Sequence, residues 1–172
     1  DLPTGFDPQW LVTYKNHCQN LVLRGVLALL FPTQDVKIGV KRFTELSDIR
    51  VAKSESDIDP KYNWALFKDD HVEIQIWVDK NRKKSSEAYE TPREVYKVTD
   101  PDDVMVLRKL KERSKGGFLL ESINGNRITH FAPMLNTYCL LIHRLRKASE
   151  LSLFDLDKSH FTPRCLRHTI NG

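Results

Sequence analysis

The chain has 172 residues, of which 40% are hydrophobic and 29% are charged; it can bury one core and is not a wholly disordered chain. Its 27 Lys and Arg residues exceed its 23 Asp and Glu residues and give a formal net charge of +4, which is compatible with a nucleic-acid-binding surface but does not require one. The longest uninterrupted apolar run, residues 25–31, is too short to cross a bilayer, and no basic and apolar leader precedes it. We therefore predict a single domain over residues 1–172 and no membrane segment.

The cysteines Cys18, Cys139 and Cys165 are odd in number and scattered along the chain without a CxxC pair. This pattern argues against a disulfide framework and against a structural zinc site. Cys165 and His168 form an isolated C-x-x-H, which has too few ligands for a metal site. We expect no metal cofactor, small core roles for Cys18 and Cys139, and a reduced, cytoplasmic setting.

The first predicted element is a helix that begins at Asp7-Pro8, an N-cap acid followed by proline at the first helical position. Apolar and small residues then recur at steps of three and four, as one face of an amphipathic helix requires. They are Leu11, Tyr14, Cys18, Leu21, Gly25 and Leu29. We therefore expect one continuous helix that ends before Pro32.

A strand is predicted at residues 72–78, where Val72, Ile74, Ile76 and Val78 alternate with other residues. A basic run follows directly and consists of Lys80, Arg82, Lys83 and Lys84. With Ser85-Ser86, this run predicts a hairpin tip, from which residues 93–98 return as the paired strand.

Three further helices are expected in the second half of the chain. Asp100-Pro101 and Thr162-Pro163 are helix starts, and residues 134–145 carry a wide apolar stripe at helical spacing. The order of elements predicts a mostly helical α+β domain with a small antiparallel sheet. The tryptophans show no pattern for base stacking and are expected in the core or against the sheet: Trp10, Trp64 and Trp77.

The terminal helix carries the sharpest chemical signal. Arg164, Arg167 and His168 are three and four residues apart, so they share one side of its first turns, while Leu166 and Ile170 lie on another face. Two guanidinium groups beside the free N–H groups of a helix start suit a phosphate. The alternative is a basic helix end that pairs with surface acids.

Several segments of the sequence, including the predicted terminal helix, resemble a known family. Residues 162–169, TPRCLRHT, resemble the second catalytic box of the tyrosine recombinases (phage integrases), whose pattern is T-P-H-x-L-R-H-T. Residues 42–46, RFTEL, resemble the first box, R-x-[ST]-E-L, and Lys80 matches the lysine of the hairpin between the boxes. Residues 126–128 and the helix at 135–145 resemble the connecting region. The likeness covers essentially the whole chain in the family's order and implies the fold of a recombinase catalytic domain.

The resemblance implies metal-free cleavage and rejoining of duplex DNA through a 3′-phosphotyrosyl intermediate. Arg42 and Arg167 would neutralise the transition state at the attacked phosphate, which suits groups that stay charged at any working pH. Lys80 would donate a proton to the leaving 5′-oxygen, a role for which Lys83 and Lys84 compete.

The implied partner is double-stranded DNA. His168 is expected to brace the second box, and family members assemble as tetramers on DNA, so the resemblance also implies self-association and, in a prokaryote, a place at the nucleoid. The further DNA-contacting residues that we expect are Arg82, Lys83, Lys84 and His168.

Two departures from the family pattern affect the expected activity. Arg164 stands where the family has its first histidine, and an arginine cannot act as a base, so it could serve only as a third electrostatic clamp. The family's nucleophilic tyrosine lies beyond the second box, whereas this chain ends at Gly172 and none of its tyrosines occupies that place. This polypeptide by itself is therefore not expected to cleave DNA.

The sequence is also compatible with other functions. The chain could be a recombinase-fold module that holds DNA without cutting it, or a helical interaction domain with no nucleic-acid role. Arg42 could instead pair with Glu45 one turn on, and Lys80 could be an ordinary charge at a hairpin.

Overall fold

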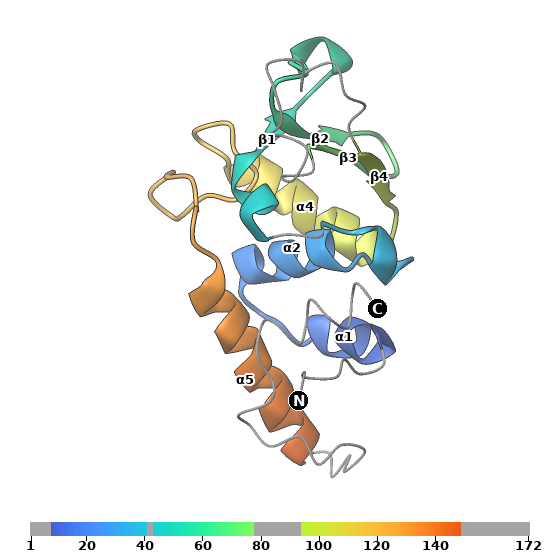
Figure 1. The fold of residues 1–172 in the computed structure, drawn as a ribbon, viewed down its shortest axis with the longest axis vertical. Coiled ribbons are helices and arrows are strands. Elements are labelled where there is room, and N and C mark those ends of the chain that lie inside the picture. The colour runs from blue at the N-terminus through green and yellow to red at the C-terminus, as the bar shows by residue number, and fades with distance from the viewer. Residues whose placement is uncertain (1–7, 41–42, 78–93, 149–172) are drawn as a thin grey trace.

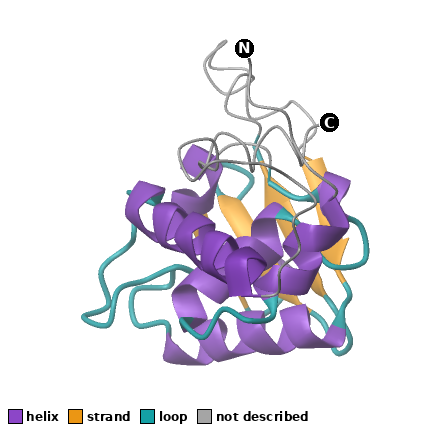
Figure 2. Ribbon diagram, turned by 90° about the horizontal axis from the view of Figure 1, so that it is seen from below, coloured by secondary structure: helices purple, strands orange, loops and turns teal. Residues whose placement is uncertain are grey.

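The computed structural model describes residues 8–40, 43–77 and 94–148, which form helices packed on one small sheet (Figure 1). The sheet lies at one end of the molecule, α2 and α4 cross beside it, and α1 and α5 lie beyond them (Figure 1). Seen from below, the helices cover the strands behind them (Figure 2). The α-helices are α1 (Pro8–Lys15), α2 (Leu21–Leu30), α4 (Pro101–Arg113) and α5 (Ala132–Ala148). The strands are β1 (Ile49–Ala52), β2 (Asn63–Phe67), β3 (Val72–Ile76) and β4 (Glu94–Val98), and the 3-10 helices of the described residues are η1 (Val36–Ile38), η2 (Phe43–Asp48) and η3 (Glu55–Asp57). The α+β class is confirmed.

The prediction of a single N-terminal helix is wrong, because the chain forms two helices separated by residues 16–20. The N–H of Cys18 donates to the carbonyl of Lys15 at 3.1 Å, in a tight turn that follows α1. The side chain of Asn20 then accepts the N–H of Leu23 at 3.0 Å and caps α2. An Asn side chain competes for backbone groups in this way, so it favours a helix start over a helix interior. The predicted end before Pro32 agrees with the structure, whereas the predicted N-cap Asp7 lies outside the described residues.

The sheet is mixed, so the predicted antiparallel sheet is only partly correct. Strands β2, β3 and β4 pair antiparallel, with Ala65 opposite Ile74 and Ile74 opposite Tyr96. Strand β1 pairs parallel to β2, because residues 53–62, which contain η3, carry the chain back to the start of its neighbour. In β3, the expected alternation is present: its apolar residues are buried and its polar residues are half-buried.

The outer edge of β1 is covered by the loop that follows α4. The N–H of Val51 donates to the carbonyl of Gly117 at 2.8 Å, and the N–H of Leu119 donates to the carbonyl of Ile49 at 2.9 Å. Gly117 has a φ of +85°, a conformation that a residue with a side chain rarely adopts. This pairing brings a segment from the second half of the chain against the strand that follows the first-box residues.

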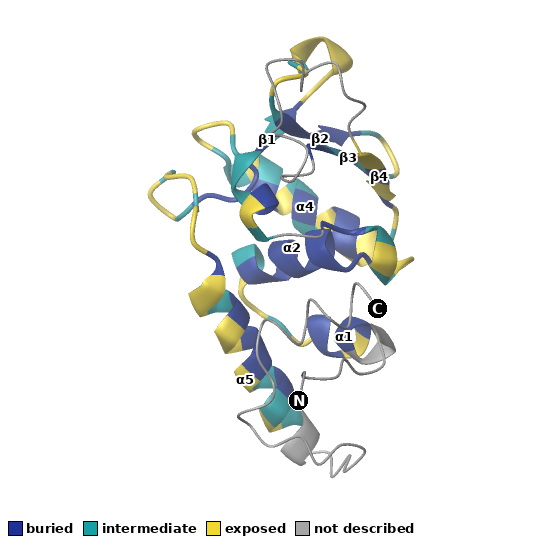
Figure 3. Cartoon of the chain, viewed as in Figure 1, coloured by how far each residue is buried: buried dark blue, intermediate teal, exposed yellow. Residues whose placement is uncertain are grey.

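The core lies where α2 meets α4 and the sheet. Helix α2 is buried from Leu23 to Leu30, as Figure 3 shows. Gly25 allows α2 to approach α4 closely, since a Cβ atom at this position would lie 2.2 Å from Cδ1 of Leu110. The helical pattern that includes Gly25 thus marks a packing surface.

Two tyrosine hydroxyls connect outer elements to this core. Tyr96 of β4 donates to the carbonyl of Leu29 at 2.9 Å, and Tyr138 of α5 donates to the carbonyl of Leu11 at 3.0 Å. Two of the three helices predicted in the second half of the chain are confirmed: α4 starts after its N-cap Asp100, and α5 covers the apolar stripe at 134–145. The third, predicted to start at Thr162-Pro163, lies outside the described residues.

Three charged side chains are buried together where α1, α2 and α4 meet. Nζ of Lys15 lies 3.0 Å from Oδ2 of Asp103, and Nη2 of Arg24 lies 2.6 Å from Oδ1 of the same carboxylate. Lys15 also donates to the carbonyl of Phe31 at 3.1 Å and to the hydroxyl of Thr33 at 2.7 Å. Lys15 and Asp103 are fully buried. We call Lys15, Arg24 and Asp103 the buried ion cluster.

The environment of the buried ion cluster changes the proton affinity of its members. Burial lowers the pKa of Lys15 to about 8, although the Asp103 carboxylate opposes this shift. Burial alone would raise the pKa of Asp103, but the charges of Lys15 and Arg24 and the N–H of Thr33 hold it below its ordinary value. At neutral pH, the pair is therefore charged on both sides.

The two cysteines among the described residues are placed as the sequence predicts. Cys139 is buried, Cys18 is half-buried against the core, and both are free thiols. Cys165 lies outside the described residues. Within the described ranges, no three His, Cys, Asp or Glu residues gather as a metal site, and no helix is long and apolar enough to cross a membrane.

Candidate nucleic-acid interface

The predicted catalytic and DNA-contacting residues all lie outside the described residues. The convergence of two distant arginines on one phosphate and the basic hairpin tip therefore stay predictions. The residues concerned are Arg42, Lys80, Arg82, Lys83, Lys84, Arg164, Arg167 and His168. The structure does describe the segments that adjoin Arg42 and Lys80 in the chain.

The segment directly after Arg42 is η2, which carries the rest of the first-box residues. Glu45 is 1% exposed and Leu46 is fully buried, so the E and L of this box anchor the segment in the core. Six residues of 3-10 helix span about 12 Å. Arg42 thus precedes a short, firmly packed helix. The alternative of an Arg42–Glu45 pair is not tested, because Arg42 lies outside the described ranges.

A buried amide joins this segment to the strand that leads toward Lys80. Asn63, the first residue of β2, is fully buried. Its Nδ2 donates to the carbonyl of Glu45 at 3.4 Å, and its Oδ1 accepts the N–H of Trp77 at 2.8 Å. Trp77 directly follows β3, and Lys80 comes three residues later. One side chain therefore ties the first-box segment to the strand before the predicted catalytic lysine.

Two tryptophans are packed as the sequence predicts. Trp64 is 9% exposed and Trp77 is 2% exposed. Their indole N–H groups donate to the carbonyls of Asp59 at 2.8 Å and Pro60 at 2.6 Å. Neither ring is available for base stacking, and the side chain of Trp10 lies outside the described residues.

Beside β1, two arginines lie against two aromatic rings. Cζ of Arg50 lies 3.6 Å from the ring centroid of Tyr62 and 5.2 Å from that of Phe118. Cζ of Arg127 also lies 5.2 Å from the centroid of Phe118, and its Nη1 lies 3.7 Å from Oδ1 of Asp48, the last residue of η2. We call Arg50, Tyr62, Phe118 and Arg127 the arginine–aromatic cluster.

The cluster depends on a loop that one carboxylate organises. Glu121 is 2% exposed and accepts the N–H groups of Lys115 at 2.7 Å, Gly116 at 2.8 Å and Phe118 at 3.1 Å. Burial alone would raise the pKa of Glu121, but these N–H groups outweigh it and hold that pKa below its ordinary value. Glu121 thereby fixes the backbone that carries the Phe118 ring.

Replacing Glu121 by Gln is expected to lower the free energy of unfolding by about 2 kcal/mol, because the amide supplies one acceptor oxygen where the loop uses two. Urea unfolding at neutral pH measures this change. The difference from the parent should shrink as the pH falls through the lowered pKa, since the carboxylate then loses its charge in the parent too. Glu112→Gln, at an exposed position of α4, is the matched control. An equal loss in both variants would contradict the role of Glu121.

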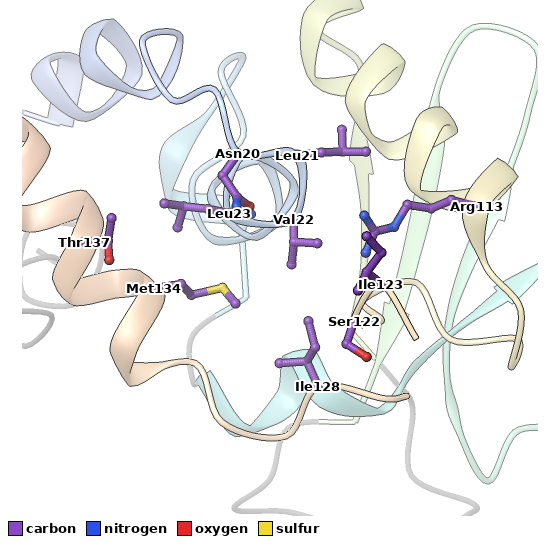
Figure 4. Close-up of a pocket in the computed structure, with 10 residues that line it drawn as sticks. All are labelled: Asn20, Leu21, Val22, Leu23, Arg113, Ser122, Ile123, Ile128, Met134 and Thr137. Atoms are coloured by element: carbon purple, nitrogen blue, oxygen red, sulfur yellow. Dashed lines mark hydrogen bonds between the residues drawn. The ribbon is translucent and has the colours of Figure 1, made fainter. Parts of the chain in front are cut away.

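The structure also contains an apolar pocket of about 430 Å³ between α2, α5 and the loop at 122–128 (Figure 4). Figure 4 shows Met134 from α5 and Ile128 from the loop facing Val22 of α2. Each polar side chain of its lining already has a hydrogen-bond partner within the chain. These polar residues are Asn20, Arg113, Ser122 and Thr137. We therefore assign no reacting group to this pocket.

The arginine–aromatic cluster cannot be predicted from the sequence, because its four members have no common spacing and come from separate segments of the chain. A partial signal existed in residues 126–128, which resemble the recombinase connecting region and contain Arg127. Asn63 and Glu121 gave no signal, since a buried amide or carboxylate becomes recognisable only through the backbone groups around it. Comparison of the chain with protein-family models, with curated proteins and with solved structures found no match.

Proposed function

We propose that this chain is the DNA-binding catalytic core of a site-specific tyrosine recombinase, a protein that breaks and rejoins DNA through a 3′-phosphotyrosyl intermediate. One observation carries the proposal: residues 42–46, Lys80 and residues 162–169 follow the family's catalytic boxes in order and, apart from Arg164, in residue type. The second box supplies most of the specificity, because so many of its flanking letters agree.

In the proposed reaction, the protein stabilises charge that develops on one phosphodiester. Arg42 and Arg167 would donate to its non-bridging oxygens, and Arg164 would add a third positive charge where the family has histidine. Lys80 would protonate the leaving 5′-oxygen. The nucleophilic tyrosine of the family has no counterpart within residues 1–172, so the activity expected of this chain alone is DNA binding.

The described residues support this proposal in two respects. Asn63 couples the segment after Arg42 to the strand before Lys80, as a site built from both segments would need. The arginine–aromatic cluster presents positive charge beside the same segment, through Arg50 on the next strand and Arg127 near Asp48. Both features are compatible with a surface that binds a polyanion.

The direct test is binding of the chain to a duplex DNA across a series of salt concentrations. We expect affinity to fall steeply with salt, as phosphate contacts require. Arg167→Ala should weaken binding by roughly tenfold near 0.1 M salt, whereas Lys109→Ala, at an exposed position of α4, should change it little. Equal effects of the two substitutions would count against a phosphate site at Arg167, and no binding at low salt would refute the function.

A second candidate is a recombinase-fold module that binds DNA without cutting it, and Arg164 in the histidine position favours it. A suicide duplex with a nick near the scissile phosphate, incubated with the natural full-length product, separates the two candidates. A covalent protein–DNA adduct would exclude the binding-only alternative, and its absence despite tight binding would favour it.

A further inference from the structure

We propose that Arg50 and Arg127 form a phosphate-binding site for the DNA backbone, in addition to the residues of the proposed catalytic boxes. The inference rests on the proposed function, since it assumes that the chain binds duplex DNA. It concerns residues that the family resemblance does not name as site residues.

Arg50 is oriented by aromatic rings and not by hydrogen bonds. Cζ of its planar guanidinium lies 3.6 Å from the ring centroid of Tyr62 and 5.2 Å from that of Phe118. The N–H donors of a guanidinium lie in that plane and point from its edge. Nε of Arg50 is buried and has no hydrogen-bond partner. The side chain of Arg50 makes no hydrogen bond or ion pair with another described residue.

The other buried or half-buried arginines of the described ranges differ from Arg50 in this respect. Each of them donates to oxygen atoms of the protein, as an arginine with a purely structural role does. They are Arg24, which donates to Asn16, Arg108, which donates to the carbonyls of Lys68 and Asp69, and Arg113, which donates to the carbonyl of Glu121. An arginine that is held by rings and lacks an acceptor is prepared for an external one.

Arg127 supplies the second guanidinium. Its side chain is 41% exposed, and its ion pair with Asp48 is long, at 3.7 Å. Because the Cζ atoms of Arg50 and Arg127 are each 5.2 Å from the centroid of Phe118, they are at most about 10 Å apart. Each strand of B-DNA carries one phosphate per about 3.4 Å of helix axis. The two guanidinium groups can therefore reach one phosphate or neighbouring phosphates of the same strand.

Charged residues of both signs lie within three residues of the cluster in the sequence. The exposed lysines are Lys53, Lys61 and Lys115, and the acids are Asp48, which pairs with Arg127, and Asp59. The nearby Glu121 carboxylate is 2% exposed and accepts backbone N–H groups, so it does not neutralise the guanidinium groups at the surface. Several cations on one surface are typical of backbone recognition in DNA.

The test measures binding of the 172-residue chain to a 30-base-pair duplex of arbitrary sequence between 0.05 and 0.3 M salt. Removing one phosphate contact makes the negative slope of log K against log salt shallower by about 0.9. If parent and variant bind equally at 1 M salt, the variant therefore binds about 8-fold more weakly at 0.1 M salt. Arg50→Gln and Arg127→Gln should each show such a change, and the double variant should lose about 60-fold. Arg144→Gln, at an exposed position in the C-terminal half of α5, removes the same charge away from β1 and should leave the slope near that of the parent.

The outcomes separate this inference from the function on which it rests. If the parent binds and the double variant matches Arg144→Gln in slope and affinity, the phosphate site is refuted and the function stands. If the parent does not bind DNA at low salt, both fail. Binding of poly-glutamate but not of duplex DNA would assign the pair to an acidic protein partner and overturn the inference. Circular dichroism checks that each variant is folded. If Arg50→Gln is unfolded, the salt slope and affinity of Arg127→Gln, which changes an exposed side chain, decide whether the phosphate site exists.

Discussion

Replacing Asp103 by Asn is expected to lower the free energy of unfolding by about 3–5 kcal/mol, because it leaves two cationic side chains buried without their counter-charge. The carboxylate of Asp103 is the only anionic member of the buried ion cluster, and it also accepts the N–H of Thr33 at 2.9 Å. An amide of the same shape keeps the packing and one acceptor oxygen but removes the charge. Urea unfolding followed by circular dichroism at pH 7 measures the loss.

The adjacent acid gives a matched control for this substitution. Asp102 lies in the same first turn of α4 but is exposed. Asp102→Asn removes the same charge from the helix N-terminus and should cost about 0.3–1 kcal/mol. If Asp103→Asn costs no more than Asp102→Asn, the buried ion cluster does not hold α1, α2 and α4 together as its geometry indicates.

The elements that the sequence predicted correctly are those whose signals are local. Strand β3 was found because Val72, Ile74 and Ile76 alternate with polar residues, and one face of β3 is buried and the other is half-buried. Helix α4 was found from Asp100-Pro101, since an N-cap and a following proline act within one turn. Such signals need no knowledge of what the element packs against.

The missed elements depend on contacts between distant parts of the chain. All five residues of β2 are buried, so no alternation marks it, and β1 has only four residues. The break between α1 and α2 was missed because the apolar steps of three and four continue through Cys18 across the turn. There, the capping side chain of Asn20 outweighs the periodicity.

The candidate site divides in the same way. The proposed catalytic boxes rest on short runs of adjacent residues that resemble the family's pattern, and such runs can be read from the sequence alone. The arginine–aromatic cluster could not be recognised in this way, since Arg50 meets Phe118 only after the loop beyond α4 has paired with β1. Long-range pairing of this kind also explains why β1 is not an exposed edge among the described residues.

The second large effect is a dependence of stability on pH above neutrality that arises from Lys15. In the folded chain, burial lowers the pKa of Lys15 from 10.5 to about 8. Between these values, the unfolded chain holds a proton that the folded chain has released, so unfolding takes up a proton and becomes less favourable as the pH rises. From pH 7.5 to 9.5, this group should therefore add about 2 kcal/mol to the free energy of unfolding.

Other groups oppose this gain at higher pH and must be separated from it. The pKa values of Tyr96, Tyr138 and Cys18 are raised by burial; the folded chain keeps these protons longer than the unfolded chain, and stability falls as the pH passes their ordinary values. The quantity to measure is thus the difference in unfolding free energy between the parent and Lys15→Met, which cancels the groups that both proteins share.

That difference should rise by about 2 kcal/mol from pH 7.5 to 9.5, since methionine cannot titrate and Asp103 keeps its ion pair with Arg24 in the variant. Lys109→Met, at an exposed position of α4, is the control, and its difference from the parent should stay flat. A flat difference for Lys15→Met as well would mean that Lys15 retains its proton at the buried carboxylate through pH 9.5. The attraction of Asp103 would then outweigh the cost of removing the Lys15 ammonium group from water, and Lys15 and Asp103 would stay an ion pair throughout this pH range.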